Sequence, residues 1–359
     1  MVRTRVVRRA LRADAQAEGP AANAVLIVCL LHPPAMPSAP AYPAAATAIA
    51  PGSIGNVAVG YDVLGSAFDA VHDRVRVERV ARAPAGPAVT VGTVTGCVTD
   101  LPRDPEANTA SAALLALVEA RSFAHGFRVH IHKGIPLSAG MGGSAASAVA
   151  AVRAAQALVD PPLSEDEVLR YALQGESVSS GALCGDNVVP IARGGLVLTR
   201  SIDPLDVVPI PVPEALHAVL VHPHMEIATR AARAVLPDAV PVSVVVQQSA
   251  NLAALVAGCY QHDPALIGRA LRDVMIEPHR SRLIPGFGAV QAAAREAGAL
   301  GSSISGAGPS VFAWAPTQPA AEHAGAAMQA AFAAEGLEAD VWTAPVAGTG
   351  AHRVAEERA

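Results

Sequence analysis

Aromatic residues are scarce in this sequence, at 3% of 359 residues, and charged residues reach only 16%. Hydrophobic residues make up 52%, which excludes disorder over most of the length and provides for a large buried core divided between two domains. The net charge is −5, and no lysine-rich or aromatic-interleaved stretch occurs. A nucleic-acid partner therefore lacks electrostatic support, and we expect a small-molecule ligand.

Cysteine is equally scarce, and the four cysteines lie far apart in the sequence. No CxxC pair occurs and no cysteine clusters with histidine, so the sequence predicts neither a disulfide framework nor a zinc site. This usage is typical of proteins in the reducing cytoplasm. The four positions are Cys29, Cys97, Cys184 and Cys259.

The first 44 residues contain no long hydrophobic run. Their apolar stretch, residues 24–31, is far shorter than the roughly 20 residues that span a bilayer. A basic start before such a stretch is also typical of a signal peptide, but Pro33 and Pro34 follow it without a small-x-small cleavage site. We therefore expect no export and no membrane partner. We interpret residues 1–44 as a disordered extension or as a segment upstream of a true start at Met36.

Beyond residue 44 the chain alternates between strand and helix patterns, which favours an α+β or α/β fold. Four prolines between Pro204 and Pro213 mark the expected domain boundary, giving domains 45–203 and 204–359. Strands are predicted at residues 47–50, 68–80, 127–132, 196–200, 217–221, 299–305 and 310–314, and near 341. Helices are predicted at residues 108–117, 144–159, 164–173, 242–259, 264–274 and 289–297, and from 320.

A glycine-rich turn, residues 140–147 (GMGGSAAS), directly precedes one of these helices. Glycine lets backbone N–H groups approach an anion closely, and a helix N-terminus adds its positive dipole end. Gly140, Gly142, Gly143 and Ser144 could therefore cradle a triphosphate. Taken alone, a tight strand-to-helix turn is the commoner interpretation. The segment is not a P-loop, because no GxxxxGK[ST] occurs in the sequence.

Two further glycine-rich segments complete a set of three: APGSIGNVAVGYDVLG at 50–65, KGIPLSAGMGGSAAS at 133–147 and SGAGPS at 305–310. In order and spacing they resemble the three motifs of the GHMP kinase superfamily, and the first is most similar to that of the homoserine kinases. The resemblance extends from about residue 46 to about residue 345. It implies an α+β fold of two domains. The N-terminal domain would be like domain 2 of ribosomal protein S5, with a left-handed βαβ crossover, and the C-terminal domain would be ferredoxin-like.

The resemblance also implies an activity: phosphorylation of the L-homoserine hydroxyl to O-phospho-L-homoserine, which requires ATP and Mg²⁺. This reaction would belong to threonine biosynthesis, and the enzyme would be a homodimer. One alternative is another GHMP kinase, acting on a mevalonate-pathway intermediate, shikimate or a sugar. Asn187 and the Thr229/Arg233 pair argue against it. A second alternative is a non-catalytic sensor of ATP and ligand, which Ser144, Glu176 and Asp62 argue against.

For the nucleotide, the resemblance assigns Mg²⁺ to Ser144 and Glu176, although Ser144 could simply cap a helix. It assigns Lys133 to the nucleotide, although Lys133 could instead be a solvated lysine at a strand end. It assigns Asn108 to adenine, although Asn108 could instead cap a helix. The full nucleotide set is Asn108, Lys133, Pro136, Gly140, Gly142, Gly143, Ser144 and Ala145.

For the acceptor, the resemblance assigns Asp62 to aiming the hydroxyl or holding the ammonium, and Arg233 to clamping the carboxylate. Asn187 stands where galactokinase and mevalonate kinase carry a catalytic aspartate, so the proton could pass to the γ-phosphate, with help from Asp62. The acceptor set is Asn56, Asp62, Cys184, Asn187, Thr229, Arg233, Arg280 and Gly306; the catalytic set is Asp62, Asn187, Ser144 and Glu176.

The sequence departs from the family pattern at two of these motifs. The usual HxDN is CGDN at residues 184–187, so a thiol replaces the histidine that contacts the substrate. Gly143 stands where serine is frequent, which removes one hydroxyl from the phosphate loop. Neither change removes the expected metal, phosphate or carboxylate ligands, but the first bears on which acceptor is bound.

Overall fold

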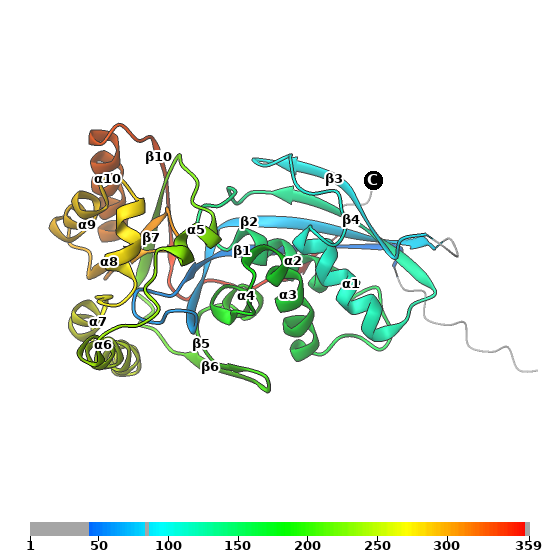
Figure 1. The fold of residues 1–359 in the computed structure, drawn as a ribbon, viewed down its shortest axis with the longest axis horizontal. Coiled ribbons are helices and arrows are strands. Elements are labelled where there is room, and N and C mark those ends of the chain that lie inside the picture. Colours follow the sequence, from blue (N-terminus) through cyan, green and yellow to red (C-terminus); the bar gives the residue numbers. More distant parts are fainter. Residues whose placement is uncertain (1–42, 83–85, 356–359) are drawn as a thin grey trace, which may run out of the picture. The chain divides into compact units, whose positions relative to one another are not determined.

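The computed structural model describes residues 43–82 and 86–355, and its secondary structure falls into two sheets (Figure 1). The expectations for residues 1–42 lie outside this part of the chain. The larger sheet has the order β11-β1-β2-β4-β3, with β5 paired to β2 and β6 paired to β5. Its strands are β1 (Ala45–Gly55), β2 (Leu64–Ala81), β3 (Val89–Gly96), β4 (His125–Lys133), β5 (Leu196–Ile202), β6 (Leu205–Ile210) and β11 (His352–Val354).

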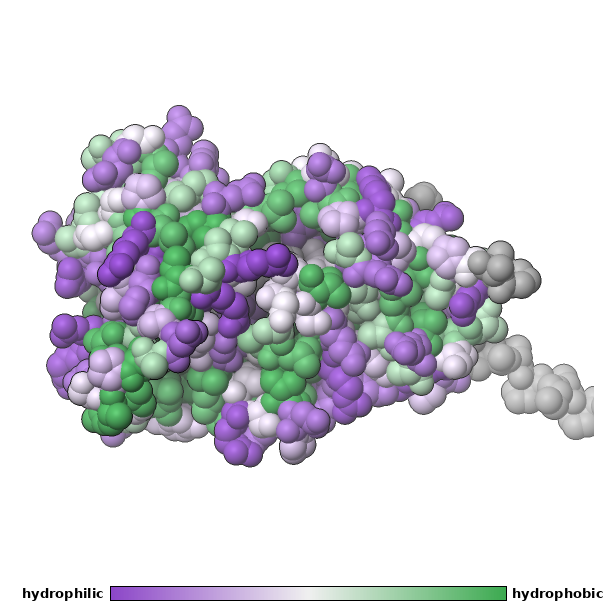
Figure 2. All heavy atoms as spheres, viewed as in Figure 1, coloured by the Kyte–Doolittle hydropathy of each residue, from purple (hydrophilic) through white to green (hydrophobic). Residues whose placement is uncertain are grey.

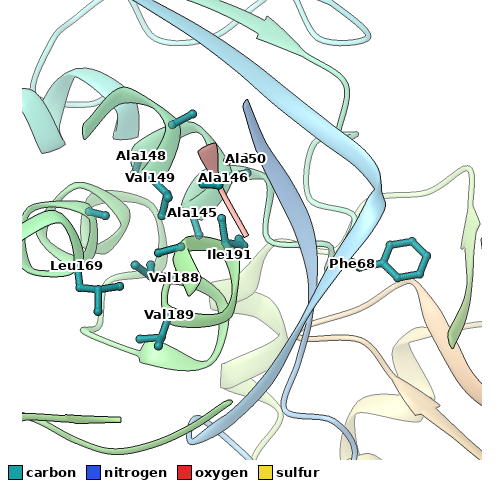
Figure 3. Packing of buried hydrophobic residues seen from close by; sticks show 14 of the residues in the cluster. Ala50, Phe68, Ala145, Ala146, Ala148, Val149, Leu169, Val188, Val189 and Ile191 are labelled. Carbon is teal, nitrogen blue, oxygen red and sulfur yellow. The ribbon is translucent and has the colours of Figure 1, made fainter. Parts of the chain in front are cut away.

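Four helices pack with the larger sheet: α1 (Thr109–Arg121), α2 (Gly143–Ala155), α3 (Glu165–Ser180) and α4 (Gly185–Arg193). Helix α2 is buried on every side from Ala145 to Ala155. Its alanines lie against Leu169 of α3 and Val188 of α4 in one apolar cluster (Figure 3). Small side chains let the helix axes approach closely, so the alanine-rich sequence after the glycine turn produces a central helix whose position is fixed by its neighbours.

The smaller sheet has the order β10-β7-β9-β8, with every pair antiparallel. Its strands are β7 (His217–Pro223), β8 (Gly301–Ile304), β9 (Val311–Ala315) and β10 (Ala339–Pro345). Helices connect β7 to β8 and β9 to β10, which gives the βαββαβ connectivity of a ferredoxin-like domain. The α+β class is therefore confirmed. The helices are α5 (Thr229–Ala234), α6 (Val242–Gln261), α7 (Pro264–Ala270), α8 (Glu277–Arg280), α9 (Phe287–Glu296) and α10 (Gln318–Ala334), with a 3₁₀ turn at Ser281–Leu283.

The expected boundary at 203/204 falls inside the β5–β6 hairpin, whose ladder runs from Leu196 opposite Ile210 to Ile202 opposite Leu205. Strand β6 pairs only with β5, and Pro209 is accommodated because an edge strand leaves one side without ladder bonds. Strand β11 also returns to β1 of the larger sheet. A division after Ile210, with the C-terminal strand assigned to the first domain, keeps the hairpin whole.

Helix α6 is the one helix of the described residues that is long and apolar enough to cross a membrane, by length and composition alone. Its inner face contains Gln248 and Asn251, whose side chains bond Val59 O and Arg272 O. Its outer face carries the exposed Val242, Val246 and Tyr260.

Helices α1 and α3 cross closely at Gly175, where a methyl group would lie 2.5 Å from Ala113 Cβ and 2.6 Å from Thr109 O. Gly175→Ala should therefore lower the free energy of unfolding by about 1–3 kcal/mol, despite alanine's better helix propensity. Gly288→Ala, in α9, is the matched control, because no atom lies within 4 Å of its new methyl. It should stabilise by about 0.5–1 kcal/mol. Urea unfolding measures both, and equal effects would contradict the proposed packing.

Candidate active site

A pocket of about 330 Å³ opens where the three glycine-rich segments meet. The face drawn in Figure 2 is hollowed near its middle, with hydrophilic side chains beside the hollow. All the residues assigned from the sequence to nucleotide, metal or acceptor line this pocket, except Ala145. The lining comes from loops far apart in the chain, so the pocket depends on how those loops are joined.

The third segment, residues 305–310, joins the other two. Ser305 Oγ donates to the Gly140 carbonyl at 2.7 Å, and Gly306 N–H donates to Gly55 O at 3.1 Å. Asn56 Nδ2 donates to Gly306 O at 2.9 Å. A methyl group on Gly140 would come within 2.4 Å of Ser305 O, so glycine is required there by close approach as well as by its positive φ. Gly306 therefore contributes through its backbone.

The first segment forms a left-handed turn in which Asn56, Val57 and Ala58 have φ of 66°, 39° and 59°. Such conformations cost on the order of 1–3 kcal/mol for residues other than glycine, most of all for a β-branched residue such as Val57, and they cluster at functional sites. Asn56 holds the turn, because its Oδ1 accepts from Asp62 N–H at 3.0 Å while its Nδ2 bonds the third segment. Both the oxygen and the nitrogen of its side-chain amide are thus hydrogen-bonded to other residues of the protein.

The second segment presents the N-terminus of α2 to the pocket. Gly142 ends the turn with φ of 69°, and the helix begins at Gly143 without a side-chain cap. The N–H groups of Gly143, Ser144 and Ala145 have no acceptor in the described part of the chain. They and the helix dipole form a site suited to an anion. The Ala145 side chain is fully buried, so this residue could act only through its N–H.

Ser144 is not the helix cap, because Gly142 occupies that position. Its hydroxyl instead donates to Glu176 Oε1 at 3.2 Å, and Ser180 Oγ donates to Glu176 Oε2 at 2.7 Å. Burial raises the pKa of Glu176 to about 7, against the lowering effect of these two hydrogen bonds. Arg233 also opposes the rise, but no cation of the described residues forms an ion pair with this carboxyl.

The donor set at Glu176 fits Mg²⁺ carried by a nucleotide better than a resident metal. Over residues 43–82 and 86–355, no group of three His, Cys, Asp or Glu side chains could hold an ion by itself. Ser144 and Glu176 offer one hydroxyl and one carboxylate, and Mg²⁺ at phosphotransfer sites commonly takes its other ligands from phosphates and water.

Lys133 is not a solvated strand end; it lines the pocket, and its assignment to the nucleotide stays a prediction. Its side chain is 4% exposed, and its three donors go to Asp73, to Gly143 O at 2.8 Å and to Ser147 Oγ at 3.1 Å. Asp73 is fully buried and accepts further bonds from the N–H groups of Gly134 and Ile135. Because Gly143 and Ser147 belong to α2, this network ties the N-terminal part of that helix to β4 and to Asp73 of β2.

Asn108 is the N-cap of α1, accepting from Ala110 N–H at 3.1 Å, and it also lines the pocket. The alternative role as a helix cap is therefore realised, while its contact with adenine stays a prediction. Thr229, at the start of α5, and Pro136 line the same pocket.

Arg233 and Asp62 form a bidentate ion pair in the pocket, with both N–O distances 3.0 Å. The sequence assigned both side chains to the substrate, whereas here they bind each other. Arg233 also donates to Tyr61 Oη at 3.0 Å and to Cys184 Sγ at 3.3 Å. Burial, reinforced by the Asp62 charge, raises the pKa of Cys184 to about 12, so this side chain is a neutral thiol.

Arg280 is a buried cation that lacks a carboxylate partner. It is 4% exposed, and no Asp or Glu of the described residues forms an ion pair with it. Its Nη1 donates to Gly306 O at 3.0 Å and its Nε to Ala232 O at 3.1 Å, while its guanidinium lies 5.1 Å from the Tyr61 ring centre. Burial lowers its pKa. A buried arginine facing a pocket without a counter-ion favours an anionic ligand.

Asn187 is oriented by two neighbours that the sequence did not reveal. Ser53 Oγ donates to Asn187 Oδ1 at 2.8 Å, and Asn187 Nδ2 donates to Asp186 Oδ2 at 3.3 Å. Asp186 is 3% exposed, and burial, followed by the charges of Asp62 and Glu176, raises its pKa to about 7.

Comparisons with known proteins identify the family and the fold. Residues 108–195 match the GHMP kinases N-terminal domain, and residues 253–334 match the GHMP kinases C-terminal domain. A homoserine kinase of Xylella fastidiosa (strain M12) is 50% identical over 306 residues, covering 85% of this chain and 93% of that protein. One of Chlorobium phaeovibrioides is 43% identical, covering 83% of this chain and 96% of that protein.

Solved structures give the same result. The crystal structure of homoserine kinase from Cytophaga hutchinsonii superposes with a TM-score of 0.82 at 41% identity, covering 87% of this chain and 98% of that one. The L. major mevalonate kinase in complex with R-mevalonate has a TM-score of 0.62 at 19% identity, covering 83% and 95% of the two chains, a likeness in fold alone.

Lys133→Met should lower the free energy of unfolding by about 3–5 kcal/mol, because it leaves the Asp73 carboxylate buried without a cation. The double variant Lys133→Met/Asp73→Asn should recover part of this loss, since the uncompensated charge is gone. Denaturant unfolding measures both. A Lys133→Met protein of wild-type stability that binds ATP poorly would instead support direct contact with the nucleotide.

Glu176→Gln should stabilise the ligand-free protein at alkaline pH. Between pH 4.5 and about 7 the folded protein binds more protons at Glu176 than the unfolded chain does. The contribution of Glu176 to the free energy of unfolding therefore falls as pH rises, and it is lost above about pH 7. The variant should therefore exceed the wild type by about 2–3 kcal/mol at pH 8, with little difference at pH 4.5. Urea unfolding without nucleotide or Mg²⁺ at both pH values is the measurement, and a less stable variant at pH 8 would count against a desolvated carboxyl.

Proposed function

The chain belongs to the homoserine kinase family of the GHMP kinases, and we propose that it transfers the γ-phosphoryl group of ATP to the side-chain hydroxyl of L-homoserine. The observation that carries the proposal is the buried guanidinium of Arg280, which forms no ion pair with any carboxylate of the described residues. It lines the same pocket as the Asp62–Arg233 pair and the α2 N-terminus. One end of the pocket thus suits a zwitterion and the other a phosphate chain.

In this proposal the acceptor carboxylate binds Arg280 and shares Arg233. Its ammonium lies by Asp62, whose oxygens face Arg233 in the ligand-free site. Arg233 must therefore divide its donors between the protein and the substrate. A planar guanidinium with five donors can do so, because its Nε is buried without a partner in the described structure.

The nucleotide phosphates would bind the N–H groups of Gly143, Ser144 and Ala145. Mg²⁺ held by Ser144, Glu176 and the phosphates would supply charge neutralisation during transfer. The protein's own part is alignment: the turn at Asn56 and the α2 N-terminus are joined through Gly306, so the acceptor and the phosphates are held at a fixed separation. Phosphoryl transfer depends mainly on such positioning and electrostatics.

Several finer features belong to the same proposal: Mg²⁺ as the metal, a place in threonine biosynthesis, a cytoplasmic location and no nucleic-acid or membrane partner. A homodimer is proposed as well. Helix α6 contains no charged residue, and its exposed Val242, Val245 and Val246 would be buried if α6 packed against its copy about a two-fold axis.

A coupled assay of ADP release tests the function directly. With Mg²⁺-ATP, release should require L-homoserine and should stay near background with mevalonate, galactose, shikimate, L-serine or L-threonine. Release with mevalonate or a sugar instead would favour a related kinase. ATP binding without release with any acceptor would favour the sensor alternative.

Arg280→Met should raise KM for L-homoserine by about 10- to 100-fold, because a charge-assisted contact with the carboxylate contributes about 1.5–3 kcal/mol. KM for ATP should change little, since Arg280 lies at the acceptor end. Arg282→Met is the matched control, because Arg282 is exposed on the adjoining 3₁₀ turn. Equal kinetics for the two variants would remove Arg280 from the acceptor site.

A further inference from the structure

Tyr61 contacts both arginines that the proposed function assigns to the acceptor carboxylate. Its hydroxyl oxygen accepts a hydrogen bond from Arg233 Nη1 at 3.0 Å. The guanidinium carbons of Arg233 and Arg280 lie 5.7 Å and 5.1 Å from the centre of its ring. One tyrosine thus connects two cations that belong to different helices, α5 and α8.

A tight turn between β1 and β2 directs Tyr61 and Asp62 to the same guanidinium. Val63 N–H donates to Gly60 O at 3.0 Å, which closes the turn, and Asp62 has φ of 60° within it. Aspartate is one of the few residues other than glycine that tolerate this conformation. The Asp62 N–H also donates to Asn56 Oδ1. Because the backbone is fixed in this way, two adjacent side chains are presented to one arginine.

The hydrogen bonds of Arg233 divide its guanidinium into a part that is held and a part that is available. Nη1 donates to Tyr61 and Asp62, and Nη2 donates to Asp62 and to Cys184 Sγ. A thiol is a weak acceptor, and Nε has no partner in the described part of the chain. Tyr61 and Asp62 therefore fix the guanidinium, while Nε and the N–H at the thiol remain for a carboxylate.

The ring of Tyr61 serves Arg280 in the same way. An aromatic ring attracts a cation that lies within about 6 Å of its centre, and the attraction is stronger where water is excluded. Arg280 is buried, and over residues 43–82 and 86–355 it has no carboxylate partner. Burial, followed by the Asp62 charge, raises the pKa of Tyr61, so the side chain is a neutral phenol that can accept from Arg233.

Tyr61 acts on a ligand through the arginines. Arg233 and Arg280 line the main pocket, whereas Tyr61 is not among the described residues that do. It lines a separate cavity of about 10 Å³ together with Arg280, which is about the space of one water molecule. Any effect of Tyr61 on the bound acceptor is therefore transmitted by the two guanidiniums.

We propose that Tyr61 is a positioning residue for the acceptor carboxylate. Its hydroxyl fixes Arg233 and its ring fixes Arg280, so that both guanidiniums meet one carboxylate. Tyr61 thereby favours acceptors that are amino acids over amino alcohols that lack a carboxylate. This inference rests on the proposed function, because it needs L-homoserine in the pocket.

Tyr61→Phe keeps the ring and removes the hydroxyl. KM for L-homoserine should rise by about 5- to 20-fold, because one N–H of Arg233 loses its acceptor. Both kcat and KM for ATP should stay within about twofold. Tyr61→Leu, which removes the ring as well, should raise KM for L-homoserine further. Tyr260→Phe is the matched control, because Tyr260 is exposed on α6, and it should change none of these constants.

An acceptor without a carboxylate separates positioning from a general effect on the fold. The compound is 3-aminopropan-1-ol, which is homoserine without its carboxylate. Its kcat/KM should differ by less than about twofold between the wild type and Tyr61→Phe, since the carboxylate that Tyr61 serves is missing. Where its turnover is too slow to measure, its Ki against L-homoserine gives the same comparison.

Two outcomes overturn the inference alone. One is a KM for L-homoserine in Tyr61→Phe within about twofold of the wild type, and the other is an equal loss with both acceptors. A Tyr61→Leu protein whose KM equals that of Tyr61→Phe overturns the part assigned to the ring. A wild-type protein that is inactive with L-homoserine overturns the proposed function itself, and the inference with it.

Discussion

The site depends on one backbone carbonyl, that of Gly306, which accepts hydrogen bonds from both Asn56 and Arg280. Asn56 accepts a hydrogen bond from the backbone of Asp62 and so fixes the turn between them. Arg280 is the last residue of α8, which lies between β7 and β8 in the sequence. Gly306 also donates its N–H to Gly55. The proposed acceptor site therefore lies where the segment after β1, helix α8 and the loop between β8 and β9 meet, and hydrogen bonds from the third glycine-rich segment link it to the other two segments.

Several charged side chains that line the pocket lack partners of opposite charge among the described residues. Glu176 and Asp186 have pKa values raised to about 7 by burial, and Arg280 has no carboxylate partner in the described part of the chain. Two of these imbalances have the sign that a ligand would correct: a cation would pair with Glu176 and an anion with Arg280. Such sites trade folding stability for function. The Lys133–Asp73 network beneath them is, by contrast, fully bonded.

Most of the helices and strands, and the location of the pocket, could be predicted from the sequence because local patterns determine them. The strand and helix patterns located most elements, and the three motifs located the pocket. Asp73 was missed although its parity with the buried Val71 and Val75 in β2 places it on the core face. Asp73 lies 60 residues from Lys133, and Ser53 lies 134 residues from Asn187, so pairing across strands and loops, not any local signal, determines these two contacts. The β5–β6 hairpin was missed because prolines, read as breakers, are tolerated on its edge strand.

The most direct measurement is a crystal structure of the protein with L-homoserine, Mg²⁺ and a non-hydrolysable ATP analogue. The account predicts the homoserine carboxylate within hydrogen-bond distance of Arg280 and Arg233, and the phosphates at the N–H groups of Gly143 and Ser144. A homoserine carboxylate bound elsewhere, with Arg280 contacting only Gly306 and Ala232 as it does without ligand, would contradict it.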